Sequence, residues 1–106
     1  MNFEDKVERG YKLLTDEERR ILSFIPVGKE NCKTSRDLAP FTGLTQKQLS
    51  AVARRALSAG YPVVACRHGF YIATCDGDVE AYKRREELRD IGHGKTIAAA
   101  ARFLQA

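Results

Sequence analysis

Apolar residues recur along most of this chain at helical spacing. From residue 3 to residue 14 they lie four, four and three positions apart, which predicts a helix with one apolar stripe. The stripe consists of Phe3, Val7, Tyr11 and Leu14. Thr15 and Glu18 have the spacing of a capping box, so we predict a second helix that begins there and ends at Pro26. Its expected buried side holds Ile21, Leu22, Phe24 and Ile25.

A short third helix is predicted after a polar connection that has room for a short strand near Cys32–Thr34. Thr34 or Ser35 can cap this helix, which should run to about Phe41 with Leu38 and Phe41 facing inward. Gly43 then supplies the turn, because glycine can leave a helix with a positive φ angle.

A longer helix follows, from Thr45 to Ala59, with Gln48 at the capping-box position and Gly60 at its end. At 100° per residue its apolar positions fall on one face. They are Leu49, Val52, Ala53, Ala56 and Leu57. The opposite face carries Lys47, Ala51, Arg54 and Ser58.

Two apolar runs come next, Val63–Arg67 and Phe70–Thr74. Both are rich in β-branched and aromatic residues, and the pair His68-Gly69 between them predicts a two-residue hairpin turn.

The tail should form two further helices. Residues 79–91 have mixed charges and predict an exposed helix, which Gly92-His93-Gly94 interrupts. A last helix then places Ile97, Ala101 and Leu104 on one apolar seam, with Phe103 beside it. This helix can pack back on the first helix or pair with its copy in a second subunit. We expect the second arrangement, a homodimer formed through this helix.

The excess positive charge is concentrated in one part of the chain. The chain has a net charge of +4, while residues 1–37 hold eight acids and eight bases, and residues 76–106 hold six of each. Residues 38–75 contain no acid and four bases, which are Lys47, Arg54, Arg55 and Arg67. A patch of one sign on the longer helix and the hairpin indicates a polyanionic partner.

The order of helix, glycine turn, helix and hairpin is typical of a winged helix-turn-helix. Residues 15–72 resemble the N-terminal domains of biotin-repressor-type proteins and small winged-helix proteins of phages and prophages. The matching segments are Ser35-Arg36-Asp37-Leu38, Gly43-Leu44-Thr45, Gly60-Tyr61-Pro62-Val63 and Gly69-Phe70-Tyr71-Ile72. The resemblance implies a mainly α fold with a small β-hairpin wing, and the ligase domain of biotin repressors has no counterpart here. We expect one domain over residues 1–106, with its core at 15–74 and a C-terminal helical extension at 79–106.

On this fold the longer helix would enter the major groove of double-stranded DNA. Residues near its N-terminus would reach base edges, and Arg54 and Arg55 would meet phosphates. The base-reading candidates are Thr45, Gln46, Lys47 and Ser50. Arg67 and His68 at the hairpin tip would touch phosphate or the minor groove. The competing interpretations are an ordinary amphipathic surface helix and solvated turn residues.

Other chemistry is poorly supported. Gly94-Lys95-Thr96 resembles the end of a phosphate-binding loop, but the glycine required five positions earlier is Arg89. Cys66, His68 and Cys75 lack the spacing of a zinc site, and two histidines offer little for catalysis. We therefore expect no enzyme, no cofactor and no metal.

The function expected is that of a small cytoplasmic DNA-binding protein, either a transcriptional regulator or a phage-type accessory factor. The three cysteines fit a reducing compartment, and neither a membrane span nor a secretory signal is evident. The alternative is a winged-helix module that docks a replication or transcription protein without binding DNA itself.

Overall fold

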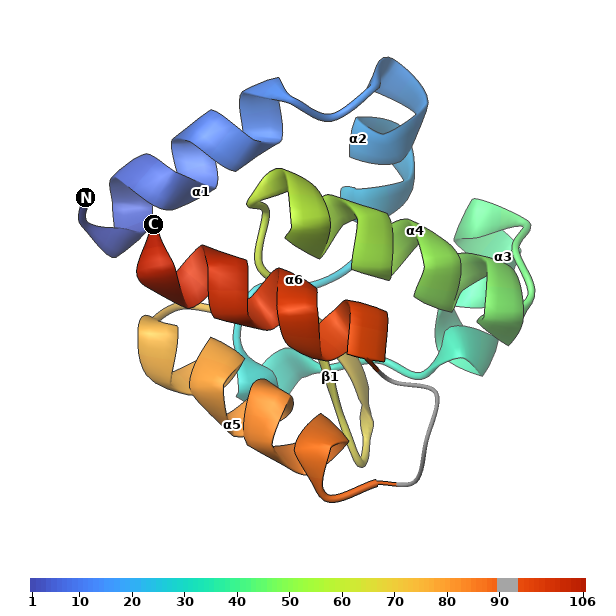
Figure 1. Cartoon of the computed structure of the whole chain (residues 1–106). Helices are drawn as coiled ribbons and strands as arrows, with labels where there is room; N and C mark the ends of the chain where they lie inside the picture. The colour runs from blue at the N-terminus through green and yellow to red at the C-terminus, as the bar shows by residue number, and fades with distance from the viewer. Residues whose placement is uncertain (90–93) are drawn as a thin grey trace.

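The computed structural model of the chain describes residues 1–89 and 94–106. The described residues form six α-helices, one short 3-10 helix and one two-stranded antiparallel hairpin (Figure 1). In chain order the elements are α1 (Phe3–Lys12), α2 (Asp16–Leu22), η1 (Lys29–Asn31), α3 (Ser35–Thr42), α4 (Gln46–Ala59), β1 (Val63–Cys66), β2 (Gly69–Ile72), α5 (Asp76–Glu87) and α6 (Gly94–Gln105). A mainly α fold with a small β-hairpin is therefore confirmed.

Three capping boxes fix where the central helices begin. Thr15 caps α2 with Glu18, as predicted, and Thr45 caps α4 with Gln48. Thr34, rather than Ser35, caps α3 and pairs with Asp37. Each threonine hydroxyl accepts a hydrogen bond from a backbone amide that would otherwise lack a helical partner. The start of each helix is therefore determined by residues close together in the sequence.

The hairpin turns one residue earlier than predicted. Cys66 pairs with Gly69, so the two turn residues are Arg67 and His68 rather than His68 and Gly69. Gly69 is needed for another reason: its φ is +133°, and a Cβ there would overlap the backbone of Lys33. Phe70 and Lys33 exchange two backbone hydrogen bonds, at 2.8 and 3.1 Å. The strand expected near Cys32–Thr34 is reduced to this one bridge.

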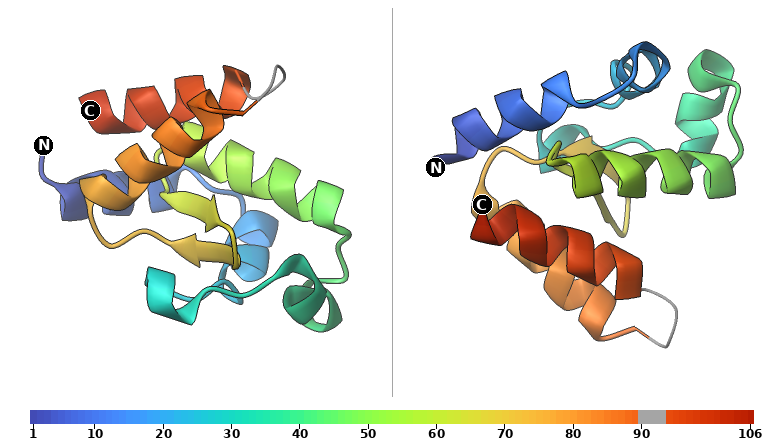
Figure 2. Two further views of the ribbon diagram at one scale, coloured as in Figure 1. Left: turned by 90° about the horizontal axis from the view of Figure 1, so that it is seen from below. Right: turned by 45° about the horizontal axis from the view of Figure 1, so that its top comes forward.

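Both faces of the hairpin are covered, which explains why its strands read as continuous apolar runs. Val63, Phe70 and Ile72 belong to a core cluster with α2, α3 and α4. Val64 and Tyr71 face the other way, into a second cluster with α5 and α6. Figure 2 shows the hairpin between these two groups of helices.

Two aromatic residues expected inside are exposed. Phe24 is 37% exposed and Phe41 is 57% exposed, and their rings stack with centroids 5.6 Å apart. Leu38 and Thr42 form the buried side of α3 instead, where the Thr42 hydroxyl donates to the Leu38 carbonyl at 3.0 Å. The buried stripe of α3 therefore lies beside Phe41 rather than on it.

The C-terminal helix α6 packs inside the chain, against α5 and alongside α4 (Figure 1). Its buried positions are Thr96, Ala99, Ala100 and Phe103. The predicted seam of Ile97, Ala101 and Leu104 is shifted by one position and is only half-buried. Phe103 packs edge-on against Phe3 of α1, with centroids 5.7 Å apart. A homodimer stays a prediction, and Ala99, Ala100 and Phe103 of α6 are already used in the core of the chain.

The first helix of the tail, α5, begins earlier than predicted. It starts at Asp76, three residues before the expected start at Val79. Gly92 and His93, in the predicted break and the loop-like motif, lie outside the described residues. No helix among the described residues combines the length and the apolar character needed to cross a membrane.

Candidate nucleic-acid interface

Helix α4 packs its apolar face against the cores and presents its polar face to solvent. Leu49, Ala53, Ala56 and Leu57 are buried and Val52 is half-buried, which confirms the predicted inward face. The exposed positions of the outward face are Lys47, Ser50, Ala51, Arg54 and Ser58. None of the fourteen residues of α4 is acidic.

The first turn of α4 divides its polar side chains between structure and surface. The Thr45 hydroxyl accepts from the Gln48 amide at 3.2 Å, and the Gln48 side chain accepts from the Thr45 amide at 3.0 Å. Both side chains are therefore held in the cap. Gln46 and Lys47 are exposed and take no part in this cap.

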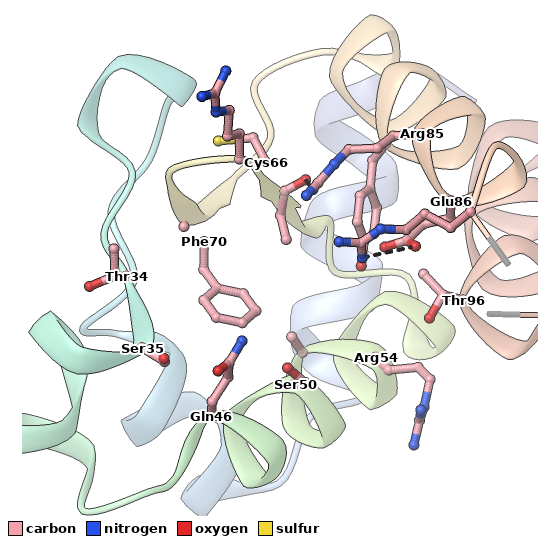
Figure 3. A pocket seen from close by; sticks show the side chains of 16 residues that line it. Thr34, Ser35, Gln46, Ser50, Arg54, Cys66, Phe70, Arg85, Glu86 and Thr96 are labelled. Atoms are coloured by element: carbon pink, nitrogen blue, oxygen red, sulfur yellow. Dashed lines mark hydrogen bonds and ion pairs between the residues drawn. The ribbon is translucent and has the colours of Figure 1, made fainter. Parts of the chain in front are cut away.

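A groove of about 480 Å³ lies between α4, the hairpin and α5 (Figure 3). Gln46, Ser50 and Arg54 line it from α4, and Arg67 joins them from the hairpin tip. The structure thus brings four of the eight predicted site residues to one place. Phe70 gives the groove an apolar surface.

The wall formed by α5 adds two cations that the sequence analysis did not include. Arg85 and Arg89 line the groove, and Arg85 also donates to the Ala65 carbonyl at 3.2 Å, which ties α5 to β1. Arg85 lies in the last turn of α5, and Arg89 lies two residues beyond the end of that helix. Because the tail is neutral when counted as a whole, its charge total gave no sign of this arrangement.

Among the described residues that line the groove, one is acidic: Glu86, which is only 4% exposed. Glu86 forms an ion pair with Arg89 at 3.6 Å. Burial, reinforced by the nearby Glu86, raises the pKa of Tyr82 to about 12, so this phenol stays neutral at physiological pH. The acid is therefore shielded by its own neighbours from a ligand in the groove.

Arg55 is engaged elsewhere. Its Nε donates to the Glu18 carboxylate of α2 at 2.7 Å, and this hydrogen bond lowers the pKa of Glu18. The charge count over residues 38–75, which contain no acid, gave no sign of this partner 37 residues away. The Arg55 side chain remains 71% exposed, but its charge is shared with Glu18.

His68 is separated from the α4 face. It is exposed at the hairpin tip beside Lys29, Tyr71 and Tyr82, in a different depression from the one lined by Gln46 and Ser50. Of the two predicted tip residues, Arg67 alone lines both depressions. Any contact of His68 with a ligand on α4 would have to reach around the tip.

A second groove runs between α4 and α6. Arg54, Arg55 and Ser58 line it from α4, and Lys95, Ala98 and Arg102 line it from α6. Lys95 and Arg102 were not among the predicted site residues. Counting charge over residues 94–106 alone would have drawn attention to them, since that segment has two bases and no acid.

Within residues 1–89 and 94–106, no group of three or more histidine, cysteine, aspartate or glutamate residues could hold a metal ion. No protein-family model, curated protein or solved structure matches the chain.

Proposed function

We propose that this protein is a winged helix-turn-helix protein that binds double-stranded DNA, as a small transcriptional regulator or a phage-type accessory protein. The observation that carries the proposal is the acid-free outward face of α4 beside a groove lined by arginines from three elements. These are Arg54 of α4, Arg67 of the hairpin, and Arg85 and Arg89 on α5 and just beyond its end. Phosphates are the polyanion that such a surface suits best.

The dimensions of α4 support entry into the major groove. An α-helix with its side chains is about 10–12 Å across, and the major groove of B-form DNA is about 12 Å wide. The order α2, α3, α4 and hairpin supports the same arrangement, in which the second helix of the motif enters the groove and the hairpin acts as the wing.

The residue types allow separate roles along α4. Gln46 can bond an adenine edge through two hydrogen bonds, Lys47 can bond guanine acceptors, and Ser50 can bond either kind of base edge. Arg54 and Arg67 lie further from the first turn and suit phosphates. Arg55, which shares its charge with Glu18, contributes less.

The test is fluorescence anisotropy of a labelled random duplex of about two helical turns, titrated from about 50 to about 200 mM salt. We expect wild-type binding that falls steeply with salt, and a clear loss of affinity in Lys47→Ala/Arg54→Ala. The matched control is Lys83→Ala/Arg84→Ala on α5, which changes net charge equally but leaves α4 intact. No binding by the wild-type protein at low salt, or equal losses in both variants, would overturn the proposal.

A second candidate function, a protein-docking module, draws on one separate observation. The stacked pair Phe24 and Phe41 exposes aromatic surface on the flank formed by the end of α2 and α3. Exposed aromatic side chains are enriched at protein interfaces. Docking without DNA binding predicts no useful DNA affinity at either salt concentration, so the same titration separates the two functions.

A further inference from the structure

The basic groove between α4 and α6 joins predicted site residues of α4 to cations of α6 that were not predicted. The two helices run side by side in the same direction, each with its N-terminal end toward the α3 side of the molecule (Figure 1). Ala99 and Ala100 of α6 are fully buried, and small side chains at these positions allow close packing of helices. The packing is continuous with Leu57 of α4 in the second core cluster.

This packing determines which face of α6 lies next to the outward face of α4. Lys95, Ala98 and Arg102 are spaced three and four residues apart, so they form one stripe on α6. All three are exposed and line the groove opposite Arg54 and Ser58. The small residues Ser58 and Ala98 line the groove together with these cations and leave room between the two helices.

The surface of the two helices has one sign of charge. Across Gln46–Ala59 and Gly94–Gln105 there are five bases and no acid. The bases are Lys47, Arg54, Arg55, Lys95 and Arg102. Among the described residues, Arg55 is the one of these five that forms an ion pair, with Glu18. An ordinary solvated surface mixes signs, as α5 does, so this arrangement favours a polyanion.

The two cations of α6 are placed to neutralise different phosphates. Seven residues separate Lys95 from Arg102, which is about 10 Å along a helix that rises about 1.5 Å per residue. Successive phosphates of one DNA strand advance about 3.4 Å along the duplex axis, so the two side chains need not compete for one charge. Both lie on the flank of α4, where a strand bordering the major groove would pass.

We propose that α6 is part of the DNA-binding surface and that Lys95 and Arg102 bind phosphates of the strand bordering the groove that α4 enters. This inference rests on the proposed DNA binding and adds a site to it. It assigns the C-terminal helix a ligand-binding role, in addition to its role in closing the second core. It also explains why α6 carries no acid while the adjoining α5 carries several.

The test compares Lys95→Ala/Arg102→Ala with wild type in the same salt titration, using Lys83→Ala/Arg84→Ala as the control of equal net charge. Each phosphate contact adds about 0.9 to the slope of log affinity against log salt, so the α6 variant should lose about two units of slope. The ratio of wild-type affinity to variant affinity should therefore fall about tenfold as salt rises from about 50 to about 200 mM. The control should keep the wild-type slope.

The outcomes separate the two proposals. If wild type binds and the α6 variant matches it in affinity and slope, α6 is not a contact and the proposed function stands. If wild type does not bind, both fail. Lys95 and Arg102 are exposed, so alanine should preserve folding, which circular dichroism can verify. Lys95→Glu/Arg102→Glu is a second test, because charge reversal should weaken DNA binding more than alanine does. Equal DNA affinity of the double glutamate and double alanine variants would overturn the inference.

Discussion

The sulfur atoms of Cys32 and Cys66 lie 3.7 Å apart, although 34 residues separate them in the chain. Cys32 directly follows the short helix η1 and Cys66 ends β1, so the pair lies where the connection before α3 meets the hairpin. Burial and the neighbouring Cys66 raise the pKa of the Cys32 thiol, which keeps it protonated at neutral pH. Cys75 is exposed, beyond the end of the hairpin.

We expect mild oxidation to join Cys32 to Cys66 rather than either one to Cys75. With the azo oxidant diamide, the two thiols would lose their hydrogens to the oxidant and form one disulfide within the chain. Peptide mapping by mass spectrometry should find the Cys32–Cys66 crosslink. The crosslink should form normally in Cys75→Ser and be absent from Cys66→Ser. A predominant crosslink to Cys75 in the native protein would contradict the observed proximity.

Gly10 should be intolerant of any side chain. A Cβ at Gly10 would overlap the carbonyl group of Gly60, because α1 crosses the C-terminal end of α4 there at backbone contact. The obstacle is backbone, which cannot rotate aside, so we expect Gly10→Ala to destabilise the fold by about 1–3 kcal/mol. Urea unfolding measures this difference.

Gly77→Ala is the matched control for that measurement. Gly77 also lies in a helix, α5, but an added Cβ would meet only the Cys75 sulfur at an ordinary 3.6 Å. Alanine is favoured over glycine in helices by up to about 1 kcal/mol, so Gly77→Ala should be neutral or stabilising. A stabilising Gly10→Ala would show that α1 does not approach α4 this closely.

Local signals predicted where α2, α3 and α4 begin and where α3 and α4 end, but α2 ends at Leu22, four residues before the expected end at Pro26. Each capping box depends on two side chains three residues apart, and Gly43 and Gly60 end their helices in the left-handed conformation at φ angles of +70° and +106°. These interactions require no knowledge of the rest of the fold. The same holds for the polar face of α4, which follows from helical spacing alone.

Long-range contacts account for what the sequence analysis missed. Lys6 is only 3% exposed because its ammonium pairs with Asp76, 70 residues away, and lies 4.9 Å from the Phe103 ring centre. The true hairpin turn depends on a backbone contact between Gly69 and Lys33. The candidate site shows the same pattern, because Lys95 and Arg102 join it only once α6 is folded against α4.

Glu18 should make stability depend on pH in the acid range. Its folded-state pKa is lowered below the ordinary 4.5, chiefly by the hydrogen bond from Arg55. Ionised Glu18 therefore adds stability above about pH 4.5, and this contribution disappears as pH falls through the lower folded-state pKa. Glu18→Gln should lower the melting temperature by about 2–4 °C at pH 7, and this difference should shrink as the pH falls below the ordinary pKa of 4.5.

Glu17→Gln is the control for this prediction, because Glu17 is an exposed acid on the same helix. Its melting temperature should follow that of the wild-type protein throughout the acid range. If the melting temperature of Glu18→Gln differed from that of the wild-type protein by the same amount at every pH, the ion pair between Glu18 and Arg55 would not form in solution.

Gln46 and Arg54 should affect DNA binding in different ways once a preferred sequence has been selected. Gln46 lies in the first turn of α4, where side chains reach base edges, so Gln46→Ala should cost about 1–3 kcal/mol on the preferred site and little on random DNA. Arg54 lies two turns further on, between both grooves, and suits a phosphate. Arg54→Ala should weaken binding to all sequences and reduce the salt slope by about one unit.

Competition between the preferred and random duplexes, measured for both variants, distinguishes the two roles. Gln46→Ala should reduce the ratio of the two affinities, whereas Arg54→Ala should leave that ratio near the wild-type value. Lys83→Ala on α5, which lines neither groove, serves as the control and should alter neither quantity appreciably. If Gln46→Ala and Arg54→Ala changed the ratio of preferred to random affinity equally, the division of α4 into a base-reading turn and a phosphate-binding turn would be wrong.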